Sequence, residues 1–326
     1  MKKIFLSGAT GYIGNRLAIR LAEEGNIVHA LYRTEEKARH LHHSNILLFK
    51  GDILDYPLIK SALKGCDEAY HVAAFAKMWS KDPSVFYQLN IEGALNVIRA
   101  ATEEGVKKLV VTSTAGVLGS SENEIIDENA NPDNYFFHYE HSKSILETSI
   151  KTLCLLGCQV VIVNPSRVYG PGLLSESNGV TRMISKYLEG KWRFIPGNGK
   201  SIGNYVYIDD VVEGHILAMQ KGRPGESYIL GGENVDYNGF FSLLGKISGK
   251  KASLYHLPVG VMMTVAYCMV FFARILNISP LIIPELVRKF TQNFRLSNRK
   301  AEEELGYRPV SLAAGMTETI KWLNKE

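Results

Sequence analysis

The chain has 326 residues and a mass of 36.3 kDa, with 46% hydrophobic and 21% charged residues and a mean hydropathy of −0.04. This balance is typical of globular proteins, and it excludes intrinsic disorder and collagen-like or low-complexity classes. The net charge is only +4 and no dense basic patch occurs, so we expect no nucleic-acid partner.

The first predicted elements form a βαβ unit. Ile4 to Leu6 is a short apolar run without polar alternation, which predicts a strand buried on both faces. A glycine-rich turn from Gly8 to Gly14 follows, and then come apolar residues at helical spacing up to Gly25. A second strand is predicted from Ile27 to Tyr32.

The glycines of this first turn have a chemical purpose in dinucleotide-binding proteins. Gly8 permits a tight turn, Gly11 lets the backbone approach a pyrophosphate, and Gly14 allows close packing of helix on strand. The helix N-terminus then faces the phosphates. The predicted dinucleotide site therefore takes in the whole turn, including Thr10, Tyr12 and Ile13.

The end of the second strand distinguishes between two cofactors. An acidic residue there would bind a ribose 2′-hydroxyl, whereas an arginine would accommodate a 2′-phosphate. Arg33 stands at this position with Lys37 one helical turn further on, and a guanidinium suits a phosphate by its planar fork of donors. We therefore expect NADP(H), with NAD(H) as the alternative in which Arg33 is a solvated loop residue.

The rest of the first half alternates strands with helices. This order predicts an α/β fold with a doubly wound parallel Rossmann sheet. Because the length exceeds what one simple core holds, we also expect a smaller, mostly helical C-terminal substrate lobe over the carboxyl edge of the sheet. The predicted strands cover 46–49, 69–72, 109–112 and 160–163, and the predicted helices cover 82–104 and 139–156. The cofactor domain is assigned to 1–165 with 201–220 returning to it, and the lobe to 166–200 and 221–326.

Tyr139 and Lys143 are spaced to share one face of the predicted helix. A cation beside the phenol would favour phenolate and lower the tyrosine pKa from its usual value of about 10. Such a tyrosine is a competent general acid near neutral pH. Because this spacing also arises by chance, the prediction depends on the surrounding motifs.

Taken together, the motifs resemble the extended short-chain dehydrogenase/reductase superfamily over essentially the whole chain. The resemblance is strongest to its dihydroflavonol-4-reductase-like and 3β-hydroxysteroid-dehydrogenase-like branches. The residues that carry it stand in the expected order: Gly8, Gly11 and Gly14, then Asp52, His71 to Ala74, Asn90, Thr112 to Thr114, Tyr139 and Lys143, and Asn164 to Pro171.

The resemblance implies a role for each matching residue. Tyr139 would be the acid/base, Lys143 would bind the nicotinamide ribose and tune Tyr139, and Thr114 would hydrogen-bond the substrate carbonyl, with Ser113 as the alternative. Asn90 would be either catalytic or a packing and capping residue. The implied cofactor contacts are Asp52 and Ile53 at the adenine, Ala73 and Ala74 along the ribose–phosphate stretch, and Pro165 and Val168 at the nicotinamide.

Sugar-nucleotide epimerases and dehydratases share this framework, but two features count against them. Their pattern usually has asparagine where Arg167 stands, and an arginine before the Val-Asp-Asp-like segment that would hold a nucleotide phosphate. The matching stretch here, 202–210, has no arginine, and Arg182 or Arg193 would have to replace it. This class stays the first alternative, and a cofactor-binding regulatory protein without chemistry is the second.

The predicted lobe contains a long uncharged run, 259–273. It is shorter than the roughly 20 residues that a spanning helix needs. Three interpretations stay open: a buried lid over the pocket, a peripheral membrane contact through 259–283 supported by Arg288 and Lys289, or a homodimer contact. Each of them fits an apolar substrate better than a charged sugar.

Metal and disulfide chemistry are not expected. His40, His42 and His43 lack a carboxylate or cysteine companion, and the four cysteines are too scattered for a disulfide framework. Buried reduced thiols fit a cytoplasmic location with possible membrane association. The sequence therefore predicts an NADP(H)-dependent oxidoreductase that interconverts a ketone and a secondary alcohol on an apolar small molecule, with Tyr139 as general acid/base.

Overall fold

The computed structural model describes residues 1–122, 124–132, 134–173, 178–250, 252–276, 278–280 and 282–325. A parallel sheet of seven strands forms its centre, in the order β10-β6-β5-β4-β1-β2-β3, so the predicted doubly wound α/β fold is confirmed. Strand order reverses between β1 and β4, which is where such sheets bind ligands. The strands are β1 (Lys3–Ser7), β2 (Ile27–Tyr32), β3 (Ile46–Lys50), β4 (Glu68–His71), β5 (Lys108–Thr112), β6 (Val160–Pro165) and β10 (Ser227–Leu230).

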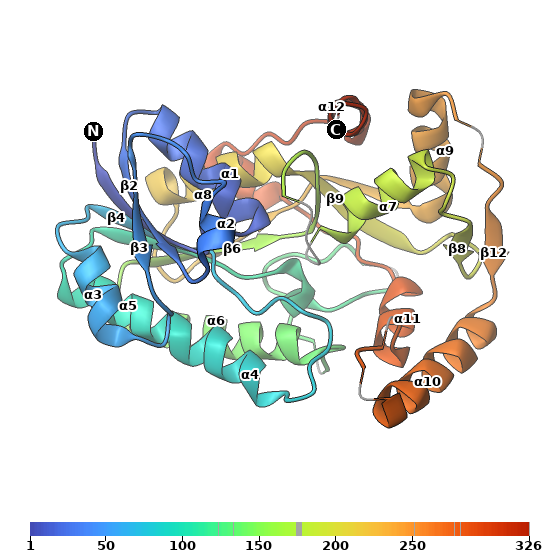
Figure 1. The fold of residues 1–326 in the computed structure, drawn as a ribbon, viewed down its shortest axis with the longest axis horizontal. Coiled ribbons are helices and arrows are strands. Elements are labelled where there is room, and N and C mark those ends of the chain that lie inside the picture. The colour runs from blue at the N-terminus through green and yellow to red at the C-terminus, as the bar shows by residue number, and fades with distance from the viewer. Residues whose placement is uncertain are drawn as a thin grey trace.

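Helices cover both faces of this sheet (Figure 1). One face carries α1 (Tyr12–Glu23) and α8 (Ile208–Lys221), and the other carries α3 (Tyr56–Leu63), α5 (Gly93–Glu103) and α6 (His138–Leu155). The helix expected over 82–104 is α4 (Ser84–Tyr87), one π turn (Gln88–Glu92) and α5 in succession.

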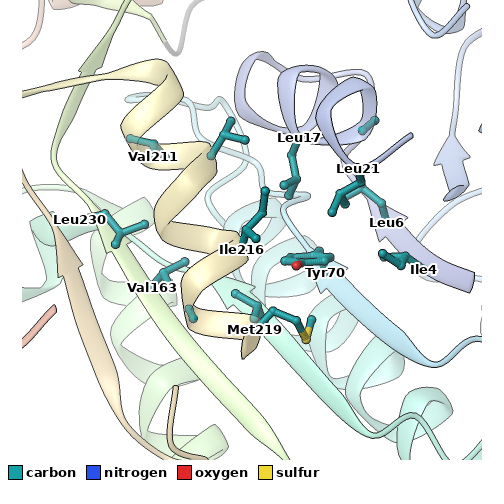
Figure 2. Packing of buried hydrophobic residues seen from close by; sticks show 14 of the residues in the cluster. Ile4, Leu6, Leu17, Leu21, Tyr70, Val163, Val211, Ile216, Met219 and Leu230 are labelled. Atoms are coloured by element: carbon teal, nitrogen blue, oxygen red, sulfur yellow. The ribbon is translucent and has the colours of Figure 1, made fainter. Parts of the chain in front are cut away.

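The core on the first face shows why α1 and α8 lie side by side. Figure 2 shows apolar side chains of the two helices meeting those of the strands beneath. The buried residues labelled there are Leu17, Leu21, Val211, Ile216 and Met219 from the helices, and Ile4, Leu6, Tyr70, Val163 and Leu230 from the strands. Their burial against strands that are covered on both faces explains the uninterrupted apolar runs in the sequence.

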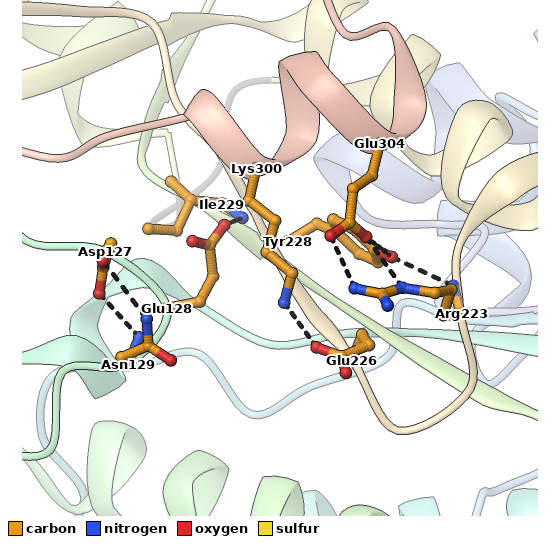
Figure 3. Close-up of polar contacts among 9 residues, drawn as sticks. All are labelled: Asp127, Glu128, Asn129, Arg223, Glu226, Tyr228, Ile229, Lys300 and Glu304. Carbon is orange, nitrogen blue, oxygen red and sulfur yellow. Dashed lines mark hydrogen bonds and ion pairs between the residues drawn. The ribbon is translucent and has the colours of Figure 1, made fainter.

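The edge strand β10 is protected by segments from elsewhere in the chain (Figure 3). The Ile229 amide donates to Glu128 Oε1 at 2.8 Å, and the Tyr228 hydroxyl donates to Glu304 Oε2 at 2.8 Å. Lys300 pairs with Glu226 at 2.6 Å. Covering an edge in this way prevents another chain from adding to it. Because β10 belongs to the central sheet, the part of the chain that builds this sheet continues past the predicted boundary at 220.

The smaller lobe lies beyond the carboxyl ends of the strands, at the right of Figure 1. Besides helices it contains two small sheets. The first has the order β11-β9-β7, and the second pairs β12 with β8. Its elements are β7 (Arg167–Tyr169), α7 (Gly179–Leu188), β8 (Phe194–Pro196), β9 (Ile202–Tyr207), β11 (Glu233–Asp236), α9 (Tyr237–Ser248), β12 (Tyr255–Leu257) and α12 (Leu312–Leu323).

The uncharged run forms most of α10 (Val259–Leu276), which packs on α11 (Pro284–Phe290) at the outer end of the lobe (Figure 1). The interpretation of this run as a buried lid is wrong, because large apolar side chains such as Phe271 and Ile275 are 61% and 64% exposed. Among the described residues, no helix is long and apolar enough to cross a membrane. Leu281 lies outside the described residues.

Candidate active site

The glycine turn between β1 and α1 is closed too tightly for any other residue at two positions. Gly8 has a φ of 81°, and a Cβ there would lie 2.5 Å from the Ala73 nitrogen. A Cβ on Gly14 would lie 2.1 Å from the Gly8 carbonyl oxygen. The turn after β1 is therefore in contact with both the segment after β4 and the first turn of α1.

The same turn fits the phosphates of a dinucleotide. Gly11 is the N-cap of α1, and no side chain caps the helix there. A Cβ on Gly11 would meet one neighbour, the Gly8 carbonyl oxygen at 3.2 Å. Amides at a helix N-terminus that no side chain satisfies, next to a face without a Cβ, form an anion site. The Tyr12 hydroxyl points elsewhere, donating to the Gly170 carbonyl at 2.8 Å.

Arg33 lies at the tip of β2 with its side chain 69% exposed. Its guanidinium is 3.5 Å from Asp52 Oδ2, a loose and solvated ion pair that contributes little stability. The nearby carboxylate of Glu35 in α2 (Glu35–Ala38) accepts from the Tyr32 hydroxyl at 3.0 Å and pairs with Lys50 at 3.1 Å. The residues at this strand tip therefore leave a largely free guanidinium where a 2′-phosphate would lie.

Tyr139 and Lys143 lie in the first two turns of α6, as the spacing predicted. Lys143 is fully buried, and its ammonium donates to the Thr112 carbonyl at 2.8 Å. Burial lowers the pKa of Lys143 to about 8. This bond fixes α6 to the carboxyl end of β5, two residues before Thr114.

The predicted effect of Lys143 on Tyr139 is wrong. Burial raises the pKa of the Tyr139 phenol above its usual value, and the neighbouring Glu140 adds to the increase. Desolvation of the phenolate outweighs the attraction of an ammonium that is directed at a backbone carbonyl. The chain therefore holds Tyr139 as a neutral phenol at neutral pH.

Thr114 lies two residues beyond β5 and is the N-cap of a short 3₁₀ helix (Ala115–Leu118). Its hydroxyl oxygen accepts from the Gly116 amide at 3.2 Å. A Cβ on Gly116 would lie 2.7 Å from Glu140 Oε1, so this turn packs directly on the first turn of α6. The structure thus brings the Thr114 segment against Glu140, the residue after Tyr139. Ser113, the alternative for the hydroxyl role, is 3% exposed and faces Glu147.

A buried polar network under these residues was not predicted. Glu147 lies one helical turn beyond Lys143, and its Oε1 accepts from Asn164 Nδ2 at 2.7 Å. The same Asn164 amide group reaches the Thr114 carbonyl at 3.2 Å. Burial raises the pKa of Glu147. Tyr139, Lys143 and Glu147 follow one another at four-residue spacing, which is the pattern that could have revealed the third member.

Asn90 lies in the π turn and is fully buried. Its Oδ1 accepts from the Phe75 amide at 2.7 Å, and its Nδ2 donates to the Ser142 hydroxyl at 2.9 Å. Both polar atoms are thus used to join the segment after β4 to α6. This geometry fits the packing alternative for Asn90.

Arg167 has an unusual environment in the first strand of the lobe. Its Nη1 donates to the hydroxyls of Tyr205 and Tyr237 at 3.3 and 3.2 Å, and its guanidinium lies 5.8 Å from the centre of the Phe294 ring. Gly203 makes room for it, since a Cβ there would lie 2.4 Å from Nη1. No carboxylate among the described residues forms an ion pair with this guanidinium. Arg182 and Arg193, which would have to replace the missing arginine of a sugar-nucleotide site, are exposed.

The remaining predicted cofactor residues are spread around the switch point between β1 and β4. Ile53 packs on Gly93, whose Cβ would lie 2.6 Å from Ile53 Cδ1, and Val168 packs partly buried against the core beneath α1 and α8. Pro165 ends β6 beside β10.

The other predicted cofactor residues lie in further segments of the chain. Thr10 belongs to the glycine turn, and Ile13 lies at the start of α1. Lys37 is exposed on α2, and Ala74 follows Ala73 after β4.

No group of histidine, cysteine or acidic side chains within the described ranges is placed to hold a metal ion. The cysteines are free, and Cys66 is buried, whereas Cys268 is exposed on α10. The prediction of buried thiols is therefore wrong for Cys268. The exposed position follows from its place on the outer side of a helix that packs only on its inner stripe.

Comparison with known proteins agrees with this geometry. A model described as "NAD dependent epimerase/dehydratase family" matches residues 4–231. A Synechocystis sp. protein, named provisionally as a dihydroflavonol 4-reductase, is 29% identical over 98% of this chain and 93% of its own. The 4-hydroxy-2-methyl-3-oxo-4-farnesyl-3,4-dihydroquinoline-1-oxide ketoreductase of Stigmatella aurantiaca is 26% identical over 94% and 91%. The UDP-glucose 4-epimerase structure of Thermotoga maritima is similar in fold, with a TM-score of 0.82 at 24% identity over 99% of both chains.

Proposed function

Since the chain belongs to the NAD dependent epimerase/dehydratase family, we propose that it is an NADP(H)-dependent oxidoreductase that interconverts a ketone and a secondary alcohol on an apolar small molecule. The motif-based assignment to the extended short-chain dehydrogenase/reductase superfamily is thereby confirmed. The observation that carries the proposal is the placement of Thr114 beside the first turn of α6, with Lys143 bonded to Thr112 beneath it.

The roles of the side chains follow from this placement. When bound, the cofactor supplies a hydride to the carbonyl carbon. Tyr139 gives its phenolic proton to the carbonyl oxygen, and the Thr114 hydroxyl donates a hydrogen bond to the same oxygen as negative charge develops there. Because burial keeps Tyr139 protonated at neutral pH, the chain is prepared for the reductive direction. Lys143 binds the nicotinamide ribose.

The apolar substrate is supported by the relatives and by the lobe. The Stigmatella relative is named as a ketoreductase of a farnesylated molecule. In this chain, an aromatic pair lies just before the first turn of α6, with the ring centres of Phe136 and Phe294 6.4 Å apart. Such side chains bind apolar surface and leave a carbonyl to Thr114 and Tyr139.

One observation favours a sugar-nucleotide epimerase or dehydratase as the second candidate. Arg167 is a guanidinium without a carboxylate partner among the described residues, in the strand that contains Val168, one of the predicted nicotinamide contacts. A nucleotide diphosphate would satisfy its remaining donors. Arg167 could therefore supply the phosphate anchor that the 202–210 segment lacks.

Tyr139→Phe tests the proposal. We expect the variant to lose at least about 100-fold in ketone reduction, because the general acid is removed, while NADPH still raises the melting temperature as in the wild type. Turnover is measured as NADPH oxidation over a panel of apolar ketones, with Tyr255→Phe, an exposed phenol of β12, as the matched control.

Full activity of Tyr139→Phe would contradict the assignment of the acid. The sugar-nucleotide alternative would be favoured if no ketone of the panel supported NADPH oxidation by the wild type and UDP or UDP-glucose raised its melting temperature. A wild type that binds NADPH and does neither would favour the regulatory alternative.

A further inference from the structure

The helix α10 buries small side chains and exposes large apolar ones, which is the opposite of the usual arrangement in a surface helix. The stripe that faces α11 contains small residues, and Ala266 and Ala273 are 0% and 6% exposed. A surface helix of a globular protein normally buries its large apolar residues and turns polar ones outward. In α10 the large apolar residues point outward instead.

The outward side chains form a continuous apolar surface, which we call the α10 patch. Its members have exposed fractions between 49% and 64%: Val261, Tyr267, Phe271, Phe272, Ile275 and Leu276. Scattered exposed apolar residues need no explanation, but a contiguous group on one helix marks an interaction surface. Beside the patch, a hollow of about 320 Å³ lies between α10 and residues 278–280, with Met269, Phe272 and Pro280 in its lining.

The charged residues of α10 and beside its patch are basic. α10 contains no aspartate or glutamate, and the one charged residue in its sequence is Arg274. On the adjoining helix, Arg288 Nη2 donates to the Tyr267 hydroxyl at 3.4 Å. An apolar helix face that has a guanidinium at its edge and no acidic residue of its own is complementary to a bilayer, which has an apolar interior beneath anionic headgroups.

We propose that the α10 patch docks on an anionic lipid bilayer, with the helix lying in the plane of the interface. The 18 residues of α10 are about 27 Å long at 1.5 Å per residue. One side of α10 packs on α11, so the opposite side is free to enter the boundary between the lipid headgroups and the acyl chains. The hollow beside Phe272 is then available to an acyl chain.

A second copy of this chain is a poorer occupant of the same surface. A symmetric dimer through α10 would place the same patch of both copies face to face. Each copy would bring the Arg288 guanidinium beside its own Tyr267 into the same interface, and like charges at an interface oppose association. An anionic bilayer has no such conflict.

The docking surface is connected to the candidate active site through α11. Lys289 lies in the last turn of α11 and forms an ion pair with Glu140, the neighbour of Tyr139. The Lys289 ammonium also lies 5.3 Å from the centre of the Phe137 ring. Docking by α10 would thus hold the first turn of α6 close to the bilayer. Resting on the proposed function, this geometry lets an apolar ketone enter from the lipid phase.

Sedimentation with vesicles tests the proposal. The full-length protein is mixed with phosphatidylcholine vesicles, or with vesicles containing 30% phosphatidylglycerol, at low and high salt. We expect sedimentation with the anionic vesicles that weakens with salt. The triple variant Phe271→Gln, Phe272→Gln, Ile275→Gln should lose at least about tenfold in vesicle affinity, since each buried side chain contributes about 1.5–3 kcal/mol.

The matched control is the triple variant Ile125→Gln, Leu155→Gln, Leu156→Gln, which replaces side chains outside α10 that are 61%, 89% and 80% exposed. It should sediment like the wild type. Absence of wild-type binding, or equal binding of both triple variants, would overturn the proposal. If the wild type is a dimer without lipid and the α10 triple variant is a monomer, a second copy of the chain is the occupant of the patch. NADPH binding and reduction of a water-soluble ketone, measured without vesicles, report separately on the proposed function.

Discussion

Arg33 is the residue on which the proposed preference for NADP(H) depends. Its guanidinium makes one loose contact with Asp52, and Glu35 is held away by Tyr32 and Lys50. A 2′-phosphate at this position would gain charge-assisted hydrogen bonds from a planar fork of donors. A ribose 2′-hydroxyl would gain much less, because no carboxylate at the strand tip is free to accept from it.

Arg33→Ala should therefore separate the two cofactors. We expect KM for NADPH to rise about tenfold, since a hydrogen bond to a charged group contributes about 1.5–3 kcal/mol, while KM for NADH changes less than about twofold. Arg39→Ala, an exposed arginine just past α2, serves as control and should change neither. An equal rise in both KM values would show that Arg33 does not contact the 2′-position.

The α1 helix is placed by backbone contact rather than by side chains at its start. Gly14 approaches the Gly8 carbonyl so closely that a methyl group would overlap backbone atoms that cannot move aside. Gly8 in turn is in contact with the backbone after β4. The start of α1, the glycine turn and the backbone after β4 are therefore in direct contact.

Gly14→Ala should lower the free energy of unfolding by about 1–3 kcal/mol, the usual cost of overpacking, and weaken NADPH binding at least about tenfold. Gly179→Ala is the control, because this first residue of α7 has open space around its Cβ position. The control should be neutral or slightly stabilising. Denaturant unfolding gives the stability, and fluorescence titration gives the affinity. An unchanged affinity for NADPH in a folded Gly14→Ala protein would contradict the role of this turn.

Buried histidines make the stability of the whole molecule depend on pH. His215 is fully buried on α8, where its Nδ1 donates to the Val211 carbonyl at 2.7 Å and its Nε2 accepts from the Thr112 hydroxyl at 2.8 Å. Burial lowers the pKa of His215 to about 4, and burial with the nearby Lys143 lowers that of His71 to about 3. Both rings are held neutral in the folded protein.

The sign of the effect follows from these shifts. Between about pH 6.5 and pH 4 the unfolded chain binds more protons at His215 than the folded one does, so the stability present above pH 6.5 is lost as the pH falls. The slope is about 1.4 kcal/mol per pH unit for one histidine. We expect His215→Gln to reduce the slope of unfolding free energy against pH by about this amount, measured by denaturant titration from pH 7.5 to 4.5. Equal slopes in both proteins would show that His215 is protonated when folded.

Much of the fold could be predicted from the sequence, because strands covered on both faces must be apolar throughout and helices must repeat their apolar residues. Ile4 to Leu6, Ile27 to Tyr32 and the glycines between them therefore indicated the βαβ unit and its order along the chain. Tyr139 and Lys143 could be placed on one helix from the sequence because their spacing depends on that helix alone.

Contacts between distant segments were decided by the tertiary structure. The sequence did not indicate that β10 joins the central sheet, that Asn164 links Glu147 to Thr114, or that desolvation raises the pKa of Tyr139. Pairing, burial and pKa depend on which groups the folded chain brings together, whereas periodicity records only which face of its own element a residue occupies. For the same reason the sequence determined that 259–273 is apolar, and only the structure decided that this surface faces outward.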